Sequence, residues 1–88
     1  MFIAVGQAQV ELKATLGITK KIESRFQQPL GSVFNNLGNA LSEELTTIIC
    51  IAADKVKDAD FIAQLDDEWD YVDLLTTVEK LIAHLLFS

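Results

Sequence analysis

The stretch of residues 41–56, LSEELTTIICIAADKV, contains the strongest structural signal in this chain of 88 residues. Its apolar residues recur every three or four positions, as on the buried face of an α-helix, and they are Leu41, Leu45, Ile48, Ile49, Ala52 and Val56. Cys50, Ile51 and Ala53 extend this apolar surface nearly all the way round. Ser42 has the side chain of a helix N-cap. The sequence therefore predicts a central, buried helix over about 42–56.

Two helices are expected after this central one, over about 60–66 and about 70–86. Asp58 or Asp60 is placed to cap the shorter helix, since a carboxylate accepts hydrogen bonds from the first free N–H groups of a helix. In the longer helix the apolar residues again follow the helical period, and they are Tyr71, Leu74, Leu75, Val78, Leu81, Ile82, Leu85 and Leu86. Each helix therefore has one face to bury against the central one.

The first fifteen residues have a different period. Apolar and polar side chains alternate from Gln7 to Ala14, which is typical of a half-buried strand, and Phe2–Val5 is a second short apolar run. Gly6 and Gln7 between them suit a two-residue hairpin turn with glycine in its first position. We expect a β-hairpin over about 2–14, which must lie on helices or pair with another chain, because an isolated hairpin is marginally stable.

Helices over about 16–27 and about 30–37 complete the predicted fold. Thr15 is a suitable N-cap for the first, and Pro29 is expected to end it, because the residue before a proline avoids the helical region. We therefore expect a mainly α protein, in which an N-terminal β-hairpin and four to five short helices pack as one small domain over residues 1–88 (α+β if the hairpin is counted).

The composition indicates a small protein that meets a partner. Half of the residues are apolar, which is more than so short a chain readily buries. No apolar run approaches the ~20 residues of a membrane helix, and the first residues lack the basic and apolar regions of a signal peptide. A single cysteine, Cys50, forms no internal disulfide, which is typical of a reducing compartment. We expect a cytoplasmic protein that does not bind a membrane.

The net charge of −6 is unevenly distributed along the chain. Residues 1–38 carry +2 and residues 39–88 carry −8, and seven acidic residues with no basic residue among them lie between Asp58 and Asp73. Nucleic-acid binding needs clustered Lys and Arg, so we expect no nucleic-acid partner. Three interpretations of the acidic segment stay open: a basic protein partner, head-to-tail self-association, or a solvated face that keeps the protein soluble.

No motif for catalysis, for a metal or for a cofactor stands out. His84 is the only histidine, and nothing in the sequence suggests a nucleophile or an orienting acid for it. Cys50 lies among isoleucines rather than in the electropositive setting of a reactive thiol. Residues 54–60 are a poor calcium loop, because Val56 and Ala59 occupy positions that need an oxygen ligand and a glycine. We therefore expect no enzymatic activity, no cofactor and no bound metal.

Two aromatic residues lie inside the acidic segment and suggest an interface. Aromatic side chains rimmed by charge are frequent anchors between proteins, although core packing is the alternative for Trp69. The hairpin supplies a second surface, because an exposed strand edge is a template for pairing and also predicts homo-oligomers. The predicted partner interface consists of Asp66, Asp67, Trp69, Tyr71, Phe2 and Ile3.

The N-terminal half also contains a series of segments that form a strand, a Thr-Leu-Gly helix start, a helix with a Glu and a Phe, and an apolar third helix. They are Val10–Ile18 (VELKATLGI), Lys21–Phe26 (KIESRF), Pro29-Leu30, Leu41–Ile49 (LSEELTTII) and Ala52-Ala53. This series resembles the tail assembly chaperones of long-tailed bacteriophages, above all the branch found in gene transfer agents and related prophages. The likeness covers about residues 2–53, and the first strand is shorter and more apolar than that family leads us to expect.

The resemblance implies a non-enzymatic protein that binds the tape measure protein, keeps its apolar helical segments soluble and helps to recruit tail tube subunits. Such chaperones act in the cytoplasm of the bacterial host and are absent from the mature virion. The family often also makes a longer, frameshifted product, of which this chain would be the shorter form. The resemblance and the apolar stripe beside acidic residues together predict that a helical segment of the partner is bound.

The residues themselves leave a different class open. A small acidic regulator, such as an antitoxin or an immunity protein, blocks a basic protein partner by charge complementarity. Small size and an acidic balance fit this function as well.

Overall fold

The computed structural model describes residues 1–87, and it begins with the hairpin. Strands β1 (Phe2–Val5) and β2 (Ala8–Glu11) are antiparallel and pair Val5 with Ala8 across a two-residue turn. Gly6 in this turn has a φ of 63°, which glycine adopts at the first position of such turns without steric cost. The predicted hairpin and its turn are thus confirmed, with strands that end before the expected residue 14.

Helix α1 spans Leu16–Phe26. Thr15 is its N-cap, and the Thr15 hydroxyl accepts a hydrogen bond from the N–H of Ile18 at 3.3 Å, as expected. The helix ends before Pro29 is reached, because Gln27 takes a left-handed conformation with a φ of 55°. The expectation that Pro29 ends α1 was therefore wrong.

Pro29 instead occupies the N-cap position of the next helix, α2 (Leu30–Asn35). A proline fits there, because its missing N–H and fixed φ do not disturb the helix that follows. A short 3-10 helix, η1 (Leu37–Asn39), continues from α2 toward the centre of the chain. Together α2 and η1 correspond to the single short helix that the sequence predicted.

The central helix, α3, spans Ser42–Ala53. Its N-cap position is Leu41 rather than Ser42, and the N–H of Leu41 donates to the Glu44 carboxylate at 2.9 Å. At the other end Asp54 takes a left-handed conformation, so the helix stops short of Val56. Capping by Ser42 and burial of Leu41 and Val56 were incorrect predictions, since Leu41 is 67 % exposed and Val56 is 54 % exposed.

Two helices complete the chain, α4 (Ala59–Glu68) and α5 (Tyr71–Phe87). Of the two residues proposed to cap α4, Asp58 does so, and its carboxylate accepts from the N–H of Phe61 at 3.1 Å. At the start of α5, Asp70 and Asp73 each accept a hydrogen bond from the backbone N–H of the other. These carboxylates satisfy helix N–H groups that otherwise have no partner.

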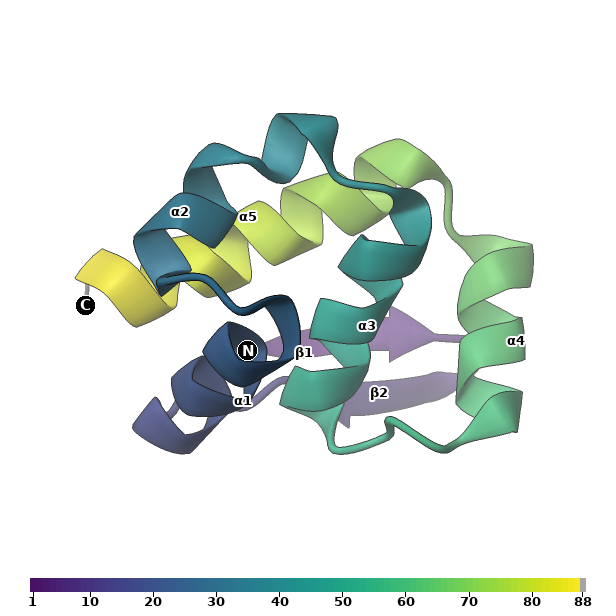
Figure 1. The fold of residues 1–88 in the computed structure, drawn as a ribbon. Helices are drawn as coiled ribbons and strands as arrows, with labels where there is room; N and C mark the ends of the chain where they lie inside the picture. The colour runs from purple at the N-terminus through teal and green to yellow at the C-terminus, as the bar shows by residue number, and fades with distance from the viewer. Residues whose placement is uncertain (88) are drawn as a thin grey trace.

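Figure 1 shows how these elements surround α3. The hairpin lies behind α3 in this view, α5 crosses behind α2 and α3, and α1 and α4 stand on opposite sides. Helix α3 packs against β2, α1, α4 and α5. The mainly helical fold with an N-terminal hairpin is therefore as the sequence predicted, with five α-helices in the described chain.

One apolar core joins the hairpin to the helices. Its most deeply buried large side chains, each less than 2 % exposed, are Leu12, Ile22, Leu45, Ile48, Ile49, Leu65, Leu81, Ile82, Val5 and Val78. Cys50 is buried among them, as expected. Within residues 1–87, no buried side chain is polar or charged, and none hides a polar atom without a hydrogen bond. Apolar burial is therefore the main source of stability.

We expect Ile48→Asp in α3 and Leu81→Asp in α5 each to abolish folding. These side chains are 1 % and 0 % exposed, and burying an unpaired carboxylate costs several kcal/mol, comparable with the ~5 kcal/mol stability of a small domain. Val72→Asp is the control, because Val72 is also on α5 but is 66 % exposed. Thermal melts by circular dichroism should show cooperative unfolding for the control alone; a near-wild-type melt for both core variants would contradict the core assignment.

We expect Asp58 to make the stability of the protein depend on acidic pH. The hydrogen bond from the Phe61 N–H, helped by Lys55, lowers the pKa of the Asp58 carboxyl below its ordinary value. A lowered folded-state pKa stabilises the protein above the unfolded-state value of about 3.9, and this contribution is lost as the pH falls through the folded-state pKa.

Asp58→Asn tests this, because asparagine keeps a capping oxygen but has no charge to titrate. Melting temperatures measured from about pH 6 down to about pH 2 should fall less steeply for the variant than for the wild type. Equal pH dependence of the two proteins would contradict the role of the Asp58 charge.

Candidate protein interface

The residue after α4, Trp69, joins this helix to the hairpin. Trp69 has an extended backbone conformation, and its indole Nε1 donates a hydrogen bond to the carbonyl oxygen of Ala4 in β1 at 3.3 Å. The ring is half-buried and packs against the edge of the core. Trp69 is therefore partly a core residue and partly a surface residue. It combines features of the two alternatives that the sequence left open, core packing and an interface anchor.

The adjacent Glu68 holds the hairpin turn. Its Oε1 accepts from the N–H of Gly6 at 3.0 Å. The turn lies close to α4, since a Cβ atom at Gly6 would be 3.1 Å from the Gln64 side-chain nitrogen. The C-terminal end of α4 thus fixes the hairpin at two points, Ala4 and Gly6.

The hydrogen-bonding pattern of the hairpin shows which backbone groups remain free. Met1 and Leu12 form a hydrogen-bonded pair. The Leu12 N–H donates to the Met1 carbonyl oxygen at 2.7 Å, and the Met1 amino group donates to the Leu12 carbonyl oxygen at 3.4 Å. Hydrogen-bonded and non-bonded pairs alternate in an antiparallel ladder. The N–H and C=O groups of Phe2 and Ala4 therefore point away from β2, which agrees with the indole bond to Ala4.

A groove runs beside this outer edge of β1. It has a volume of about 430 Å³ and is lined by Ile3, Ala4, Glu68, Trp69, Asp73 and Thr77. We call it the β1 groove. Strand β1 forms one wall, α5 forms the other with Asp73 and Thr77, and Trp69 and Glu68 come from the end of α4. Both carboxylates are solvent-exposed, so the groove has an acidic rim.

Three of the six predicted interface residues lie at or near this groove. Trp69 and Ile3 line it, while Phe2, which precedes Ile3 in β1, is 65 % exposed. The Ile3 side chain itself is 8 % exposed and belongs to the core, so it was an incorrect choice for a contact residue. Glu68 and Asp73 were not chosen, although both are in the acidic segment. The bond from Gly6 to Glu68 spans 62 positions and has no signal in the sequence, whereas the reciprocal bonds of Asp70 and Asp73 have the three-residue spacing of a capping box.

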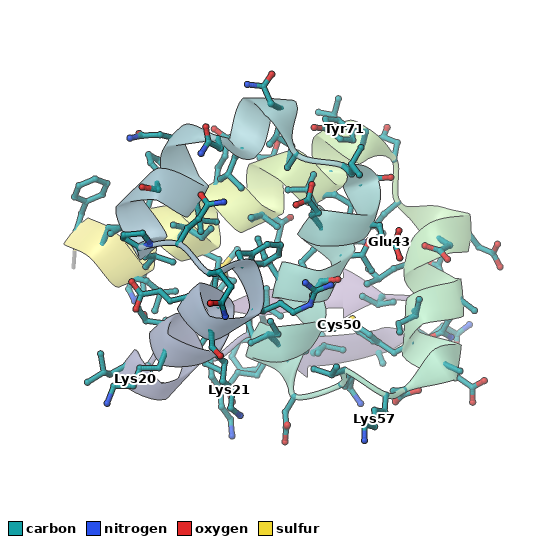
Figure 2. All side chains as sticks on the ribbon, viewed as in Figure 1. Lys20, Lys21, Glu43, Cys50, Lys57 and Tyr71 are labelled. Atoms are coloured by element: carbon teal, nitrogen blue, oxygen red, sulfur yellow. The ribbon has the colours of Figure 1, made fainter. Side chains whose placement is uncertain are left out.

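The other three predicted residues lie elsewhere. Asp66 lines a hollow between α3 and α4 with Glu43, and Asp67 is exposed on α4. The Tyr71 hydroxyl donates to the carbonyl oxygen of Ala40 at 2.8 Å, next to the start of α3 (Figure 2). The structure therefore does not bring the six residues together in one site.

The two residues with the strongest potential for chemistry lie away from the β1 groove. Burial, and then the nearby carboxylates of Asp58 and Asp66, raise the pKa of the Cys50 thiol, which favours the unreactive protonated form. His84 is exposed on α5 and lines a different hollow, beside Leu16 of α1. In the described part of the chain, no group of three or more His, Cys, Asp or Glu residues is arranged to hold a metal ion.

Comparisons with known proteins add no assignment: no family model matches the chain, and no curated protein or solved structure matches it. None of the helices within residues 1–87 is long and apolar enough to span a lipid bilayer. What the geometry itself defines is a small helical domain with a half-covered strand edge, an aromatic side chain and an acidic rim. These are features of a peptide-binding or protein-binding surface.

We expect Trp69→Phe to loosen the hairpin. The substitution keeps an aromatic ring but removes the N–H that binds Ala4, and loss of such a hydrogen bond costs about 1 kcal/mol. Amide hydrogen exchange of Ile3 and Val10, which pair across the ladder, should become faster. Tyr71→Phe is the control, because it removes the bond to Ala40 but leaves the hairpin untouched. Unchanged hairpin exchange in Trp69→Phe would contradict the anchoring role of the indole.

Proposed function

We propose that this chain is a non-enzymatic tail assembly chaperone of a long-tailed phage or prophage, which binds the tape measure protein and tail tube subunits in the host cytoplasm. The single observation that carries the proposal is the β1 groove, where an aromatic side chain, an open strand edge and carboxylates meet. The resemblance of residues 2–53 to this family supplies the identity of the partners.

Exposed apolar side chains support a role in holding another protein. Those more than half exposed are Phe2, Leu16, Leu41, Val56, Val72 and Phe87. A chaperone must offer apolar contacts to a client while keeping the complex in solution, and a net charge of −6 on so small a chain favours solubility. Exposed apolar side chains together with a high negative charge suit a protein that transiently binds apolar helical segments of a long client and keeps them in solution.

A second function is supported by the separation of charge in space. Lys20 and Lys21 project from α1 on one side of the molecule (Figure 2), while α4 with its carboxylates lies on the other (Figure 1), where Lys55 and Lys57 are the basic residues just before it. An acidic end of this kind suits a regulator that neutralises a basic protein. The partner distinguishes the two functions: a chaperone binds a very long helical protein, whereas a neutralising protein binds a short basic one.

We expect immobilised fragments of the co-encoded tape measure protein to bind this chain, with kinetics that separate two effects. Trp69→Ala should speed dissociation, because aromatic anchors hold complexes together. Charge reversal of Asp66 and Asp67 together should slow association and reduce its salt dependence, because exposed charges act mainly on the encounter. Both effects are measured across a salt series.

Ser24→Ala is the control, because Ser24 is an exposed, uncharged residue on α1, outside the β1 groove and outside the set of exposed apolar side chains. It should leave both rates unchanged, and circular dichroism confirms that all variants are folded. If no fragment binds, the chaperone function is refuted. If fragments bind equally well to every variant, the function stands and the placement of the interface is refuted.

A further inference from the structure

The outer edge of β1 carries backbone groups that lack a partner within the described chain. Of the four groups of Phe2 and Ala4 that point away from β2, only the Ala4 carbonyl is bonded, and its donor is the Trp69 indole rather than a neighbouring strand. The two N–H groups and the Phe2 carbonyl remain. Both residues are solvent-exposed, and the β1 groove lies along this edge at Ile3 and Ala4.

The two walls of the β1 groove suit an extended occupant. A new strand would lie about 4.8 Å from β1 in the hydrogen-bonding direction, on the side where the groove separates β1 from α5. A helix satisfies its own backbone groups and would leave the free N–H and C=O groups of β1 unpaired. The groove therefore favours a strand over the bound helix that the sequence analysis expected.

The charges along the groove indicate the chemistry of the occupant. Glu68 and Asp73 line the groove with Trp69, so a Lys or Arg side chain there would meet two carboxylates. A second copy of this chain fits poorly. Its own β1 (FIAV) has no charge, and the only charge in its β2 (AQVE) is the carboxylate of Glu11, so neither strand supplies a cation for this groove.

We propose that β1 takes up an extended, cationic segment of a partner protein as a third strand between β1 and α5, with a basic side chain beside Trp69, Glu68 and Asp73. The free groups of Phe2 and the N–H of Ala4 bond to the backbone of the segment, which takes the place of the Trp69 indole at the Ala4 carbonyl. The carboxylates select the charge of the segment. This inference rests on the proposed function only in taking a protein as the ligand. It assigns the bound conformation and the charge of the segment.

The probe is a blocked hexapeptide of alternating lysine and valine, titrated into the 15N-labelled protein. The Phe2 and Ala4 amides should shift and become protected from hydrogen exchange, while the Gln9 and Glu11 amides, which face the opposite edge of the hairpin, should not. Two matched peptides test the chemistry: one with glutamate for lysine, and one with N-methyl valine, which removes alternate backbone donors and hinders strand pairing. Both should bind at least about tenfold more weakly.

Two proline variants test the edge itself. Ala4→Pro removes an N–H that faces away from β2 and keeps the carbonyl that Trp69 binds, and proline is tolerated at such edge positions. We expect it to weaken peptide binding about tenfold, by loss of one hydrogen bond and partial blocking of the edge. Gln9→Pro makes the same change on the other edge and should bind like the wild type.

The outcomes separate this inference from the chaperone function. Equal binding of the lysine, glutamate and N-methyl peptides, or shifts confined to the Gln9 edge or to the hollow between α3 and α4, would overturn it. Protection of Phe2 and Ala4 that rises with protein concentration without peptide, together with a doubled mass, would show self-pairing and would also overturn it. If Ala4→Pro does not fold, the wild type still tests the inference, through protection of the Phe2 and Ala4 amides on adding the lysine peptide. Binding to tape measure fragments is a separate measurement.

Discussion

The C-terminal half of helix α3 is apolar on nearly every side, and burying it determines where the other elements lie. Its residues from Ile48 to Ala52 are all buried, although successive residues of a helix point in directions about 100° apart. Such a helix is stable only when other elements cover it all round. In a chain of 88 residues this requires most of the remaining structure, so β2, α1, α4 and α5 all pack on α3.

Because most elements pack on α3, few residues remain to cover the outer faces of these elements. Each surrounding element buries one face on α3 and presents the other to solvent, which is why apolar side chains such as Phe2 and Val72 remain exposed. The hairpin is the extreme case, because a two-stranded sheet has two edges and no neighbouring strand for either. The end of α4 covers part of the β1 edge, through Trp69 and Glu68. The β1 groove is the part that stays uncovered.

The same reasoning explains which sequence predictions succeeded. Thr15 and Asp58 were recognised as caps because a cap acts on N–H groups two or three residues away, and the structure confirms both. The prediction that Ser42 caps α3 was wrong, because Leu41 is the last residue with an extended backbone before the helix. The N–H of Leu41 donates to the Glu44 carboxylate. The prediction that Val56 is buried on α3 was wrong, because Asp54 takes a left-handed conformation and ends the helix before Val56. Periodicity alone does not reveal such an end.

The sequence by itself determined the elements of this protein: a hairpin with a glycine turn, the apolar central helix, the amphipathic helices around it, and the acidic segment with its tryptophan. These properties depend on neighbours within one or two turns of the chain. Only the tertiary structure decided the partners of Trp69 and Glu68, because Ala4 and Gly6 lie more than sixty positions away. Periodicity shows which face of an element is buried, but not what it meets. The groove between β1 and α5 exists through such long-range contacts alone.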